Sequence, residues 1–376
     1  MTWMIVAGDF TPLGGMDRAN HALAGYLGAR EEVHLVTHRA WPDVSALSGV
    51  VVHEVPRPFR RHLLGAPLLA RAGRGLWRTL PHAGLHAVVN GGNCRLPAAN
   101  WVHYLHAAAC PSASTAAMTV KNAFTYRRDR ANERAALSAA RVVICNSERT
   151  KRDVVERAGV DASRAQVIYY GSDPSRFSRA TAAERAEARA ALGKSAGAPV
   201  VGFVGALGDR RKGFDTLFAA WRDLCRSTSW DADLVVVGAG AELPRWRARA
   251  AGEGLERRVS FLGFREDVPK LLAGLDLLVH PARYEAYGLS VHEAICRGVP
   301  AIVSASAGVA EKYPAPLESL LLRSSDDPDE LMDRLRTWRR NADAVRAAVV
   351  PVSDALLGRT WDHMAAEIVQ AVEAAA

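Results

Sequence analysis

The sequence has no apolar run long enough to cross a membrane. A spanning helix needs about 18 consecutive apolar residues, and no stretch of that length occurs. The first residues, MTWMIVAGDF, lack the basic start and the extended apolar stretch of an export signal, so they predict a first β-strand instead. These absences favour a cytoplasmic protein and leave open a peripheral position at the inner face of the membrane.

Cysteine is also scarce. The five cysteines are odd in number and show no CxxC spacing; they are Cys94, Cys110, Cys145, Cys225 and Cys296. Two of them, Cys145 and Cys296, lie in apolar runs. We therefore expect reduced cysteines in the core and no zinc site.

Acidic residues are missing from one long interval. No Asp or Glu occurs between Glu54 and Asp129, whereas the basic residues there are Arg57, Arg60, Arg61, Arg71, Arg74, Arg78, Arg95, Lys121, Arg127 and Arg128. One-sided charge attracts an anionic partner, such as a phospholipid surface, a phosphorylated acceptor or a nucleic acid. A solvated face in an arginine-rich protein, whose net charge is +8, is the alternative.

The chain is too long, at 376 residues, for one ordinary core, and its composition is that of a globular protein. Short apolar runs rich in β-branched residues alternate with helical patterns. The predicted strands are 4–7, 33–37, 50–55, 86–90, 101–105, 142–145, 166–168, 200–205, 233–238, 259–263, 275–280 and 301–304. This alternation predicts an α/β fold with parallel sheets covered by helices on both faces.

A turn-rich stretch, YYGSDPSRF, and the polar helix after it interrupt the alternation at 169–193. We expect one Rossmann-like domain over 1–182 and a second over 183–357, with a C-terminal helix at about 358–376 that can pack back onto the first. Ligands of such sheets bind at the carboxyl ends of the strands, where loops and helix N-termini meet.

The segment HPARYEAYGLSVHE joins a predicted buried strand to a predicted helix. Glu285 precedes the helix and Glu293 lies in its first turns. Leu289 and Ser290 lie where the helix begins, so their backbone amides lack partners within the helix. A diphosphate could rest on those amides, with one carboxylate reaching each flanking sugar. A helix with an ordinary acidic N-terminal bias is the alternative.

This segment resembles glycosyltransferase family 4, whose pattern is a glutamate, seven residues and a second glutamate, with Phe/Tyr-Gly after the first. The chain has EAYGLSVHE at this place, preceded by Pro281 and followed by GVPAIVSASAGVAE, which ends in Glu311. The resemblance implies the GT-B fold, two Rossmann-like domains with parallel sheets facing across a deep cleft. It also implies that Glu285 meets hydroxyls of the donor sugar and that Glu293 meets the ribose.

A second element, GFVGALGDRRKGFDTLFAAW, leads from a strand through a glycine-rich loop into a helix. Lys212 matches the phosphate-binding lysine of the family, and a lysine is a compact charge suited to a diphosphate. Many members carry an arginine directly after the strand, where this chain has Ala206. Arg210 or Arg211 is then expected to supply that charge.

Two elements of the first half match the family as well. Gly14 and Gly15 lie between the first strand and the first helix, where a backbone can approach a ligand closely. Their position matches the family's N-terminal glycine-rich loop, which faces the donor phosphates and the acceptor. In WVHYLHAAA, His106 is a better match than His103 to the histidine that contacts the transferred sugar.

Loops of the second half supply further candidates. Phe264 and Arg265 follow a strand that ends in glycine, where the family holds the nucleotide base. Asp231-Ala-Asp233 resembles a manganese-binding DxD motif, but it lies at the start of a strand, away from the expected site. Gly238-Ala-Gly240 lacks the third glycine of a dinucleotide fingerprint and is explained by a tight strand-to-helix turn.

These residues predict a glycosyltransferase that moves a hexose from a UDP- or GDP-linked sugar to a hydroxyl of a glycan or lipid-linked acceptor, and the family resemblance implies that the anomeric configuration is retained. Cell-surface polysaccharide or glycolipid synthesis is the expected context. The expected catalytic residues are His106, Glu285 and Lys212. Without an obvious protein nucleophile, we expect front-face attack, in which the leaving diphosphate oxygen takes the acceptor's proton. No metal and no cofactor besides the nucleotide-sugar substrate is expected.

The acceptor is expected on the first domain. The stretch RRHLLGAPLLARAGRGLWRTL mixes Arg with Leu and Trp, which suits a helix on an anionic membrane in contact through Arg57–Arg78. A surface helix with its apolar side in the core is the alternative. A sugar-nucleotide epimerase, a phosphorylase or other GT-B enzyme, and a non-catalytic basic protein that binds membranes or nucleic acid are the competing functions; we expect no nucleic-acid partner.

Overall fold

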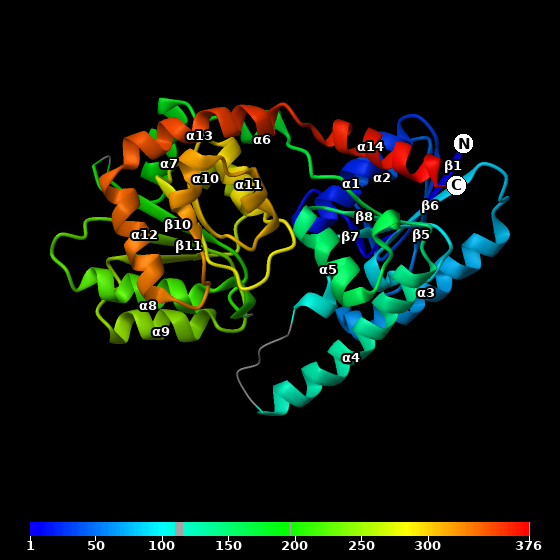
Figure 1. The fold of residues 1–376 in the computed structure, drawn as a ribbon, viewed down its shortest axis with the longest axis horizontal. Helices are drawn as coiled ribbons and strands as arrows, with labels where there is room; N and C mark the ends of the chain where they lie inside the picture. The colour runs from blue at the N-terminus through cyan, green and yellow to red at the C-terminus, as the bar shows by residue number, and fades with distance from the viewer. Residues whose placement is uncertain (110–115, 196, 209, 376) are drawn as a thin grey trace. The chain divides into compact units, whose positions relative to one another are not determined.

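The computed structural model describes residues 1–109, 116–195, 197–208 and 210–375, with side chains from Thr125 onward in helix α4. It divides into two compact units, Met1–Gly171 with Arg359–Ala376, and Ser172–Gly358; Figure 1 shows the chain coloured along its length. Along the described ranges, no helix combines the length and the apolarity that crossing a bilayer requires.

The units divide between Gly171 and Ser172, whereas the expected division lay between 182 and 183. The difference has a physical reason, because residues 172–182 are held by the second unit. The Ser172 hydroxyl donates to the Leu356 carbonyl at 2.7 Å, and Arg297 donates to the Ser178 carbonyl at 2.8 Å. The helix that follows, α7 (Ala182–Ala191), is held there as well, since its Arg185 and Arg189 form ion pairs with Asp276.

The first unit contains a seven-stranded sheet in the order β5-β3-β1-β6-β7-β8-β9, and all its strand pairs are parallel. The strands are β1 (Thr2–Val6), β3 (Glu32–Thr37), β5 (Val50–Glu54), β6 (Leu85–Asn90), β7 (Ala99–Val102), β8 (Val142–Cys145) and β9 (Ala165–Val167). A separate pair joins β2 (Asp9–Phe10) to β4 (Arg39–Ala40). Strand β7 begins and ends earlier than the predicted 101–105, since Ala99 is already in register with Val142 of β8.

Helices surround this sheet: α1 (Gly15–Gly28), α2 (Pro42–Ser45), α3 (His62–Thr79), α4 (Ala116–Ala139), α5 (Glu148–Ala158) and α14 (Trp361–Ala374). Helix α14 is the C-terminal helix, and it groups with the first unit. The two chain segments that leave this unit run against each other at Gly171. A Cβ on Gly171 would lie 2.3 Å from the backbone of Thr360, so a larger residue would force the segments apart.

The second unit contains a six-stranded parallel sheet in the order β12-β11-β10-β13-β14-β15. Its strands are β10 (Val200–Val204), β11 (Asp233–Val237), β12 (Val259–Gly263), β13 (Leu277–His280), β14 (Ala301–Ser304) and β15 (Leu321–Leu322). Its helices are α6 (Pro174–Phe177), α7, α8 (Phe214–Cys225), α9 (Leu243–Gly252), α10 (Val268–Ala273), α11 (Leu289–Cys296), α12 (Pro328–Arg340) and α13 (Ala342–Leu357). The predicted α/β fold with two parallel sheets is confirmed.

Each sheet has one place where the strand order reverses direction. In the first unit it lies between β1 and β6, and in the second between β10 and β13. At such a point neighbouring loops leave the sheet in opposite directions and open a crevice beyond the carboxyl ends of the strands. The loops after β1, β10 and β13 are those in which the sequence placed the glycine pair, the lysine and the first glutamate.

Candidate functional site

Three side chains converge at the reversal point of the second sheet. Lys212 Nζ lies 2.5 Å from Glu285 Oε2, and His280 Nε2 lies 2.8 Å from the same oxygen. The His280 ring is fully buried, and Glu285 retains 14% of its side-chain exposure. The structure thus brings two predicted residues together and adds a third that the sequence did not single out.

The charges of this cluster favour an ionised Glu285. Burial alone would raise the pKa of Glu285, but the Lys212 charge and the hydrogen bond from His280 outweigh it and hold that pKa well below its usual range. Burial is the main cause that lowers the pKa of His280. The neutral ring therefore donates from Nε2, because an ionised carboxylate only accepts hydrogen bonds.

Backbone contacts fix the lysine loop against the glutamate loop. Gly213 adopts a φ of 71° just before α8, and a Cβ there would lie 1.8 Å from the carbonyl oxygen of Pro281. The Arg283 amide donates to the carbonyl oxygen of Arg211 at 2.8 Å. Glycine meets both the positive φ and the close approach. Gly213 is therefore what lets Lys212 reach Glu285.

The amino end of α11 lies directly after this cluster. Gly288 is its N-cap with a φ of 115°, and a Cβ there would lie 3.3 Å from Glu285 Cγ. Helix geometry leaves the amides of Leu289 and Ser290 without intrahelical acceptors, which makes this end attractive to an anion. Glu293 lies one turn further on and is 9% exposed.

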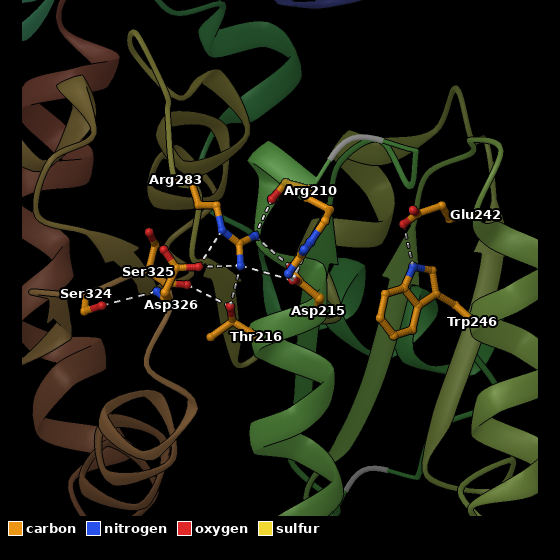
Figure 2. A network of polar contacts seen from close by, with 9 residues as sticks. All are labelled: Arg210, Asp215, Thr216, Glu242, Trp246, Arg283, Ser324, Ser325 and Asp326. Atoms are coloured by element: carbon orange, nitrogen blue, oxygen red, sulfur yellow. Dashed lines mark hydrogen bonds and ion pairs between the residues drawn. The ribbon is translucent and has the colours of Figure 1, made fainter. Parts of the chain in front are cut away.

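The two arginines of the lysine loop have different surroundings. Figure 2 shows Arg210 and Arg283 converging on Asp215, at 2.7 Å and 2.8 Å, while Arg283 also reaches Asp326 at 2.6 Å. Arg210 is 53% exposed and ties the loop to α8. The positive charge of Arg211, by contrast, acts on Glu285 and lowers its pKa, and Arg211 donates to the Tyr284 carbonyl at 3.3 Å.

The candidates for the nucleotide base lie beyond the edge strand β12. Phe264 is 66% exposed, which is unusual for an aromatic side chain and leaves its ring accessible. Arg265 forms an exposed ion pair with Asp267 at 2.6 Å. Both residues are at the carboxyl edge of the sheet, as Lys212 and Glu285 are, and β11 separates their strand from β10.

The two motifs set aside in the sequence have structural explanations. Asp231 pairs with Arg339 at 2.5 Å, and Asp233 pairs with Lys194 at 3.0 Å at the amino end of β11. Gly238 has a φ of 149°, and a Cβ there would lie 1.8 Å from the Gly205 carbonyl oxygen. These positions hold ion pairs and a tight turn at places where a ligand is not needed to explain them.

In the first unit, Gly14 is the N-cap of α1 with a φ of 84°, and Gly15 is the first residue of that helix. His106 begins a short 3-10 helix after β7, and its ring Nδ1 lies 3.0 Å from Glu133 Oε1. The amides of His106 and Ala107 also donate to Glu133, at 3.1 Å and 3.3 Å. Glu133 thus fixes His106 through its ring and its backbone.

The two histidines of WVHYLHAAA have different surroundings in the structure. The His103 ring is buried, and its Nδ1 lies 2.5 Å from the Tyr170 hydroxyl. Burial lowers the pKa of His103 to about 3, so this ring is neutral and structural. His106 keeps 34% of its side-chain exposure and is the one that can meet a ligand.

His280 and Glu133 were missed in the sequence for different reasons. His280 ends an apolar strand, where a single histidine indicates a core residue. Glu133 lies 27 residues after His106 within a long helix, so only tertiary structure brings them together. Among the cysteines, Cys94, Cys145 and Cys296 are buried and free, and burial raises the pKa of Cys145 to about 12; Cys110 lies outside the described residues.

Two family models together match most of the chain. The model described as glycosyltransferase family 4 matches residues 13–176, and the one described as glycosyl transferases group 1 matches residues 184–348. The chain belongs to glycosyltransferase family 4. The second match includes the Lys212–Glu285 cluster, and the first includes His106.

Solved structures share the fold over the full chain, the glycosyltransferase WaaG among them. WaaG, involved in lipopolysaccharide biosynthesis, has a TM-score of 0.77 and 20% identity, and covers 99% of each chain. Anabaena HepE in complex with UDP-glucose has a TM-score of 0.74 and 20% identity, and covers 100% of each chain. The GT-B fold predicted from the sequence is confirmed.

Curated relatives match over a part of their length. The D-inositol 3-phosphate glycosyltransferase of Nocardia farcinica is 28% identical over 251 residues, 65% of this chain and 54% of the relative. The chain spans about half the length of such relatives. Their activities and acceptors are therefore properties of those proteins.

Proposed function

We propose that this protein is a retaining glycosyltransferase that transfers a hexose from a UDP- or GDP-linked sugar to a hydroxyl of a glycan or lipid-linked acceptor. Cell-surface polysaccharide or glycolipid synthesis is the proposed context. The observation that carries the proposal is the Lys212–Glu285 pair at the reversal point of the second sheet, directly before the amino end of α11. One cation, one carboxylate and the amino end of a helix thus come together where two loops meet.

The donor's parts correspond to the parts of the site. Lys212 and the amides of Leu289 and Ser290 bind the diphosphate, since helix N-termini and cations attract anions. Glu285 accepts hydrogen bonds from hexose hydroxyls, and Glu293 from the ribose. The aromatic face of Phe264 and the neighbouring Arg265 hold the base.

The transfer step needs no protein nucleophile in this proposal. The acceptor oxygen attacks the anomeric carbon on the face from which the diphosphate leaves, the bond between that carbon and the diphosphate oxygen breaks, and this oxygen takes the acceptor's proton. Positive charge at Lys212 stabilises the leaving diphosphate where a metal ion would otherwise do so. The family resemblance assigns the transferred sugar to His106, and the donor phosphates and the acceptor to the Gly14–Gly15 loop.

Arg211 is the arginine that we propose to replace the family arginine at Ala206. Its charge acts on Glu285, whereas Arg210 is engaged with Asp215. Arg211→Ala should weaken UDP or GDP binding about tenfold, the usual effect of losing one charged hydrogen bond. Arg210→Ala is the matched control and should leave that affinity within about twofold.

Binding and product analysis test the proposal directly. Calorimetry with UDP, GDP, ADP and their hexose conjugates should show one nucleotide family bound, with thermal stabilisation that rises with ligand concentration. Proton NMR of the product of transfer to a supplied acceptor should show the donor's anomeric configuration, unchanged in EDTA. If no nucleotide in the panel binds, the donor-site assignment is wrong; an inverted product would sink the proposed stereochemistry alone.

The acceptor side of the proposal concerns helix α3 and the turn before it. One face of α3 lies in the core, where Leu69 is buried. For that face, the alternative of a surface helix with its apolar side in the core holds. A second apolar group is exposed: Phe59 (86%), Leu63 (38%), Leu64 (41%) and Leu68 (38%). We call these four residues the apolar patch.

Positive charge surrounds the apolar patch. Arg60, Arg61 and Arg71 are exposed, whereas Arg57 pairs with Asp9. Apolar side chains among arginines are complementary to an anionic phospholipid surface, which offers both acyl chains and phosphates. We propose that the protein rests on such a surface through the apolar patch, at the inner face of the membrane, where a lipid-linked acceptor would be presented.

Phe59 supplies a sharp test of membrane contact. Its φ of 52° is a conformation that costs a side chain about 1 kcal/mol and costs glycine little. Phe59→Gly should therefore retain or raise the melting temperature while it lowers co-sedimentation with phosphatidylglycerol vesicles several-fold. Val350→Gly on α13 removes another exposed apolar side chain as a control. Unchanged sedimentation of Phe59→Gly with a Leu64→Ser change added would refute the membrane contact.

A further inference from the structure

The side chain of His280 is buried, but packing in the core does not account for a histidine at this position. Its ring is fully buried and lies beside Phe203, with ring centroids 6.4 Å apart and planes at 20°. Nε2 donates to Glu285 Oε2, while Nδ1 is buried without a hydrogen-bond partner among the described residues. An unsatisfied buried nitrogen weakens folding, so an apolar residue would suit the strand better.

The contacts of Glu285 indicate what His280 does in the site. Lys212 and His280 both meet Oε2, which leaves Oε1 as the oxygen that can turn to a ligand. In the proposed function Lys212 also binds the donor diphosphate, so its ammonium must divide its hydrogen bonds between phosphate and carboxylate. A carboxylate held by Lys212 alone would lose its orientation when the donor arrives.

We propose that His280 is a positioning residue for Glu285: it holds Oε2 from within the core so that Oε1 stays directed at the hexose hydroxyls while Lys212 engages the diphosphate. This inference rests on the proposed function and extends it to the recognition of the hexose. The strand fixes His280, and the donor does not contact it. Its effect should therefore concern the sugar and not the nucleotide.

The experiment compares a nucleotide with its sugar conjugate. The variant His280→Leu fills the space of the imidazole ring and removes the N–H group that donates to Glu285. Its affinity for UDP should stay within about twofold of that of the unmodified protein. The affinity for UDP-glucose should fall about tenfold, as for one hydrogen bond to a charged group. GDP and GDP-mannose serve as the second pair if UDP does not bind.

A conservative variant separates positioning from a packing role. The amide nitrogen of Gln can donate where Nε2 of histidine does, so His280→Gln should restore most of the UDP-glucose affinity. Equal losses of UDP and UDP-glucose in His280→Leu, or a failure of His280→Gln to restore the difference, would overturn the inference. If the unmodified protein binds no nucleotide sugar, it is the proposed function that fails.

A pH profile gives a second readout. The charged or titratable groups that act on Glu285 are Lys212, Arg211 and His280. Loss of the His280 hydrogen bond should raise the pKa of Glu285, so the acid limb of sugar-specific binding should move to higher pH in His280→Leu and not in His280→Gln. An unchanged acid limb in both variants would contradict the proposal.

Discussion

Each unit contains a histidine paired with a glutamate, and the buried member of the pair is the histidine in one unit and the glutamate in the other. In the second unit His280 is fully buried and Glu285 is the partly exposed partner. In the first unit Glu133 is buried, with 2% side-chain exposure, and His106 is the partly exposed partner. The exposed member can meet a ligand, and the buried member orients it.

The comparison extends to the position of the proton. Carboxylates accept hydrogen bonds, so His280 carries its proton on Nε2 and His106 carries one on Nδ1. The second unit therefore offers a negative oxygen to hydroxyl donors, whereas the first offers the Nε2 side of an imidazole. One arrangement suits the hydroxyls of a sugar, and the other suits a single directed contact with it.

The largest effect is expected from Glu285→Gln, since it removes the charge of the exposed partner. Catalytic efficiency in transfer should fall by about 100-fold or more, because the lost carboxylate orients the sugar and balances Lys212. Glu318→Gln, an exposed change elsewhere in the same unit, is the control. Full activity of Glu285→Gln would mean that the carboxylate charge plays no part in the site.

A smaller effect on activity, with a larger one on stability, is expected from Glu133→Gln. Glutamine has one accepting oxygen, so its amide would face a backbone N–H or the His106 ring, at a cost of about 1–3 kcal/mol for a buried mismatch. Transfer should fall about tenfold, and the melting temperature should fall as well.

Nitrogen NMR decides whether that loss acts through His106. The His106 ring should move away from the Nδ1–H form in Glu133→Gln, while the His280 ring keeps its Nε2–H form. An unchanged His106 tautomer with reduced activity would show that Glu133 acts only through the backbone amides.

The sheets could be predicted from the sequence because buried parallel strands are continuous apolar runs. Strands β8, β12 and β14 match their predicted bounds. The predicted elements stop at 304 and resume at about 358, whereas the structure has α12 and α13 between them. Helix α12 has Leu331, Leu335 and Trp338 at helical spacing, so the sequence does contain its pattern, and the prediction missed it. Helix α13 contains Pro351, which interrupts a helical pattern, so its packing decides it.

The candidate site also contains residues that the sequence predicted and residues that it did not. Lys212 and Glu285 lie in loops whose local pattern marks them, and the reversal point of the sheet brings them together. His280 looks like a core residue and Glu133 like an ordinary helix residue until their partners are known. What could not be predicted is the set of buried groups that orient the exposed ones, since those contacts depend on the tertiary fold.

The smallest effect concerns Asp17, a carboxyl in the first turn of α1 beside the glycine loop. Burial, then the charge of Asp9, raise its pKa to about 6. A raised pKa means that the folded state binds the proton more tightly than the unfolded state. The stability of the folded protein therefore falls as pH rises from about 4 through 6, the opposite of Glu285, whose stabilising charge is lost only as pH falls.

Asp17→Asn removes this penalty without changing the shape of the side chain. The variant should unfold at the same temperature as the unmodified protein below about pH 4 and about 2–4 °C higher above pH 7, for about 1 kcal/mol after solvent screening. Thermal unfolding across this range, with Asp362→Asn as a control in the first turn of α14, measures the difference. A gain that is independent of pH would show that the charge of Asp17 does not destabilise the folded state, so that the contrast with Glu285 does not hold.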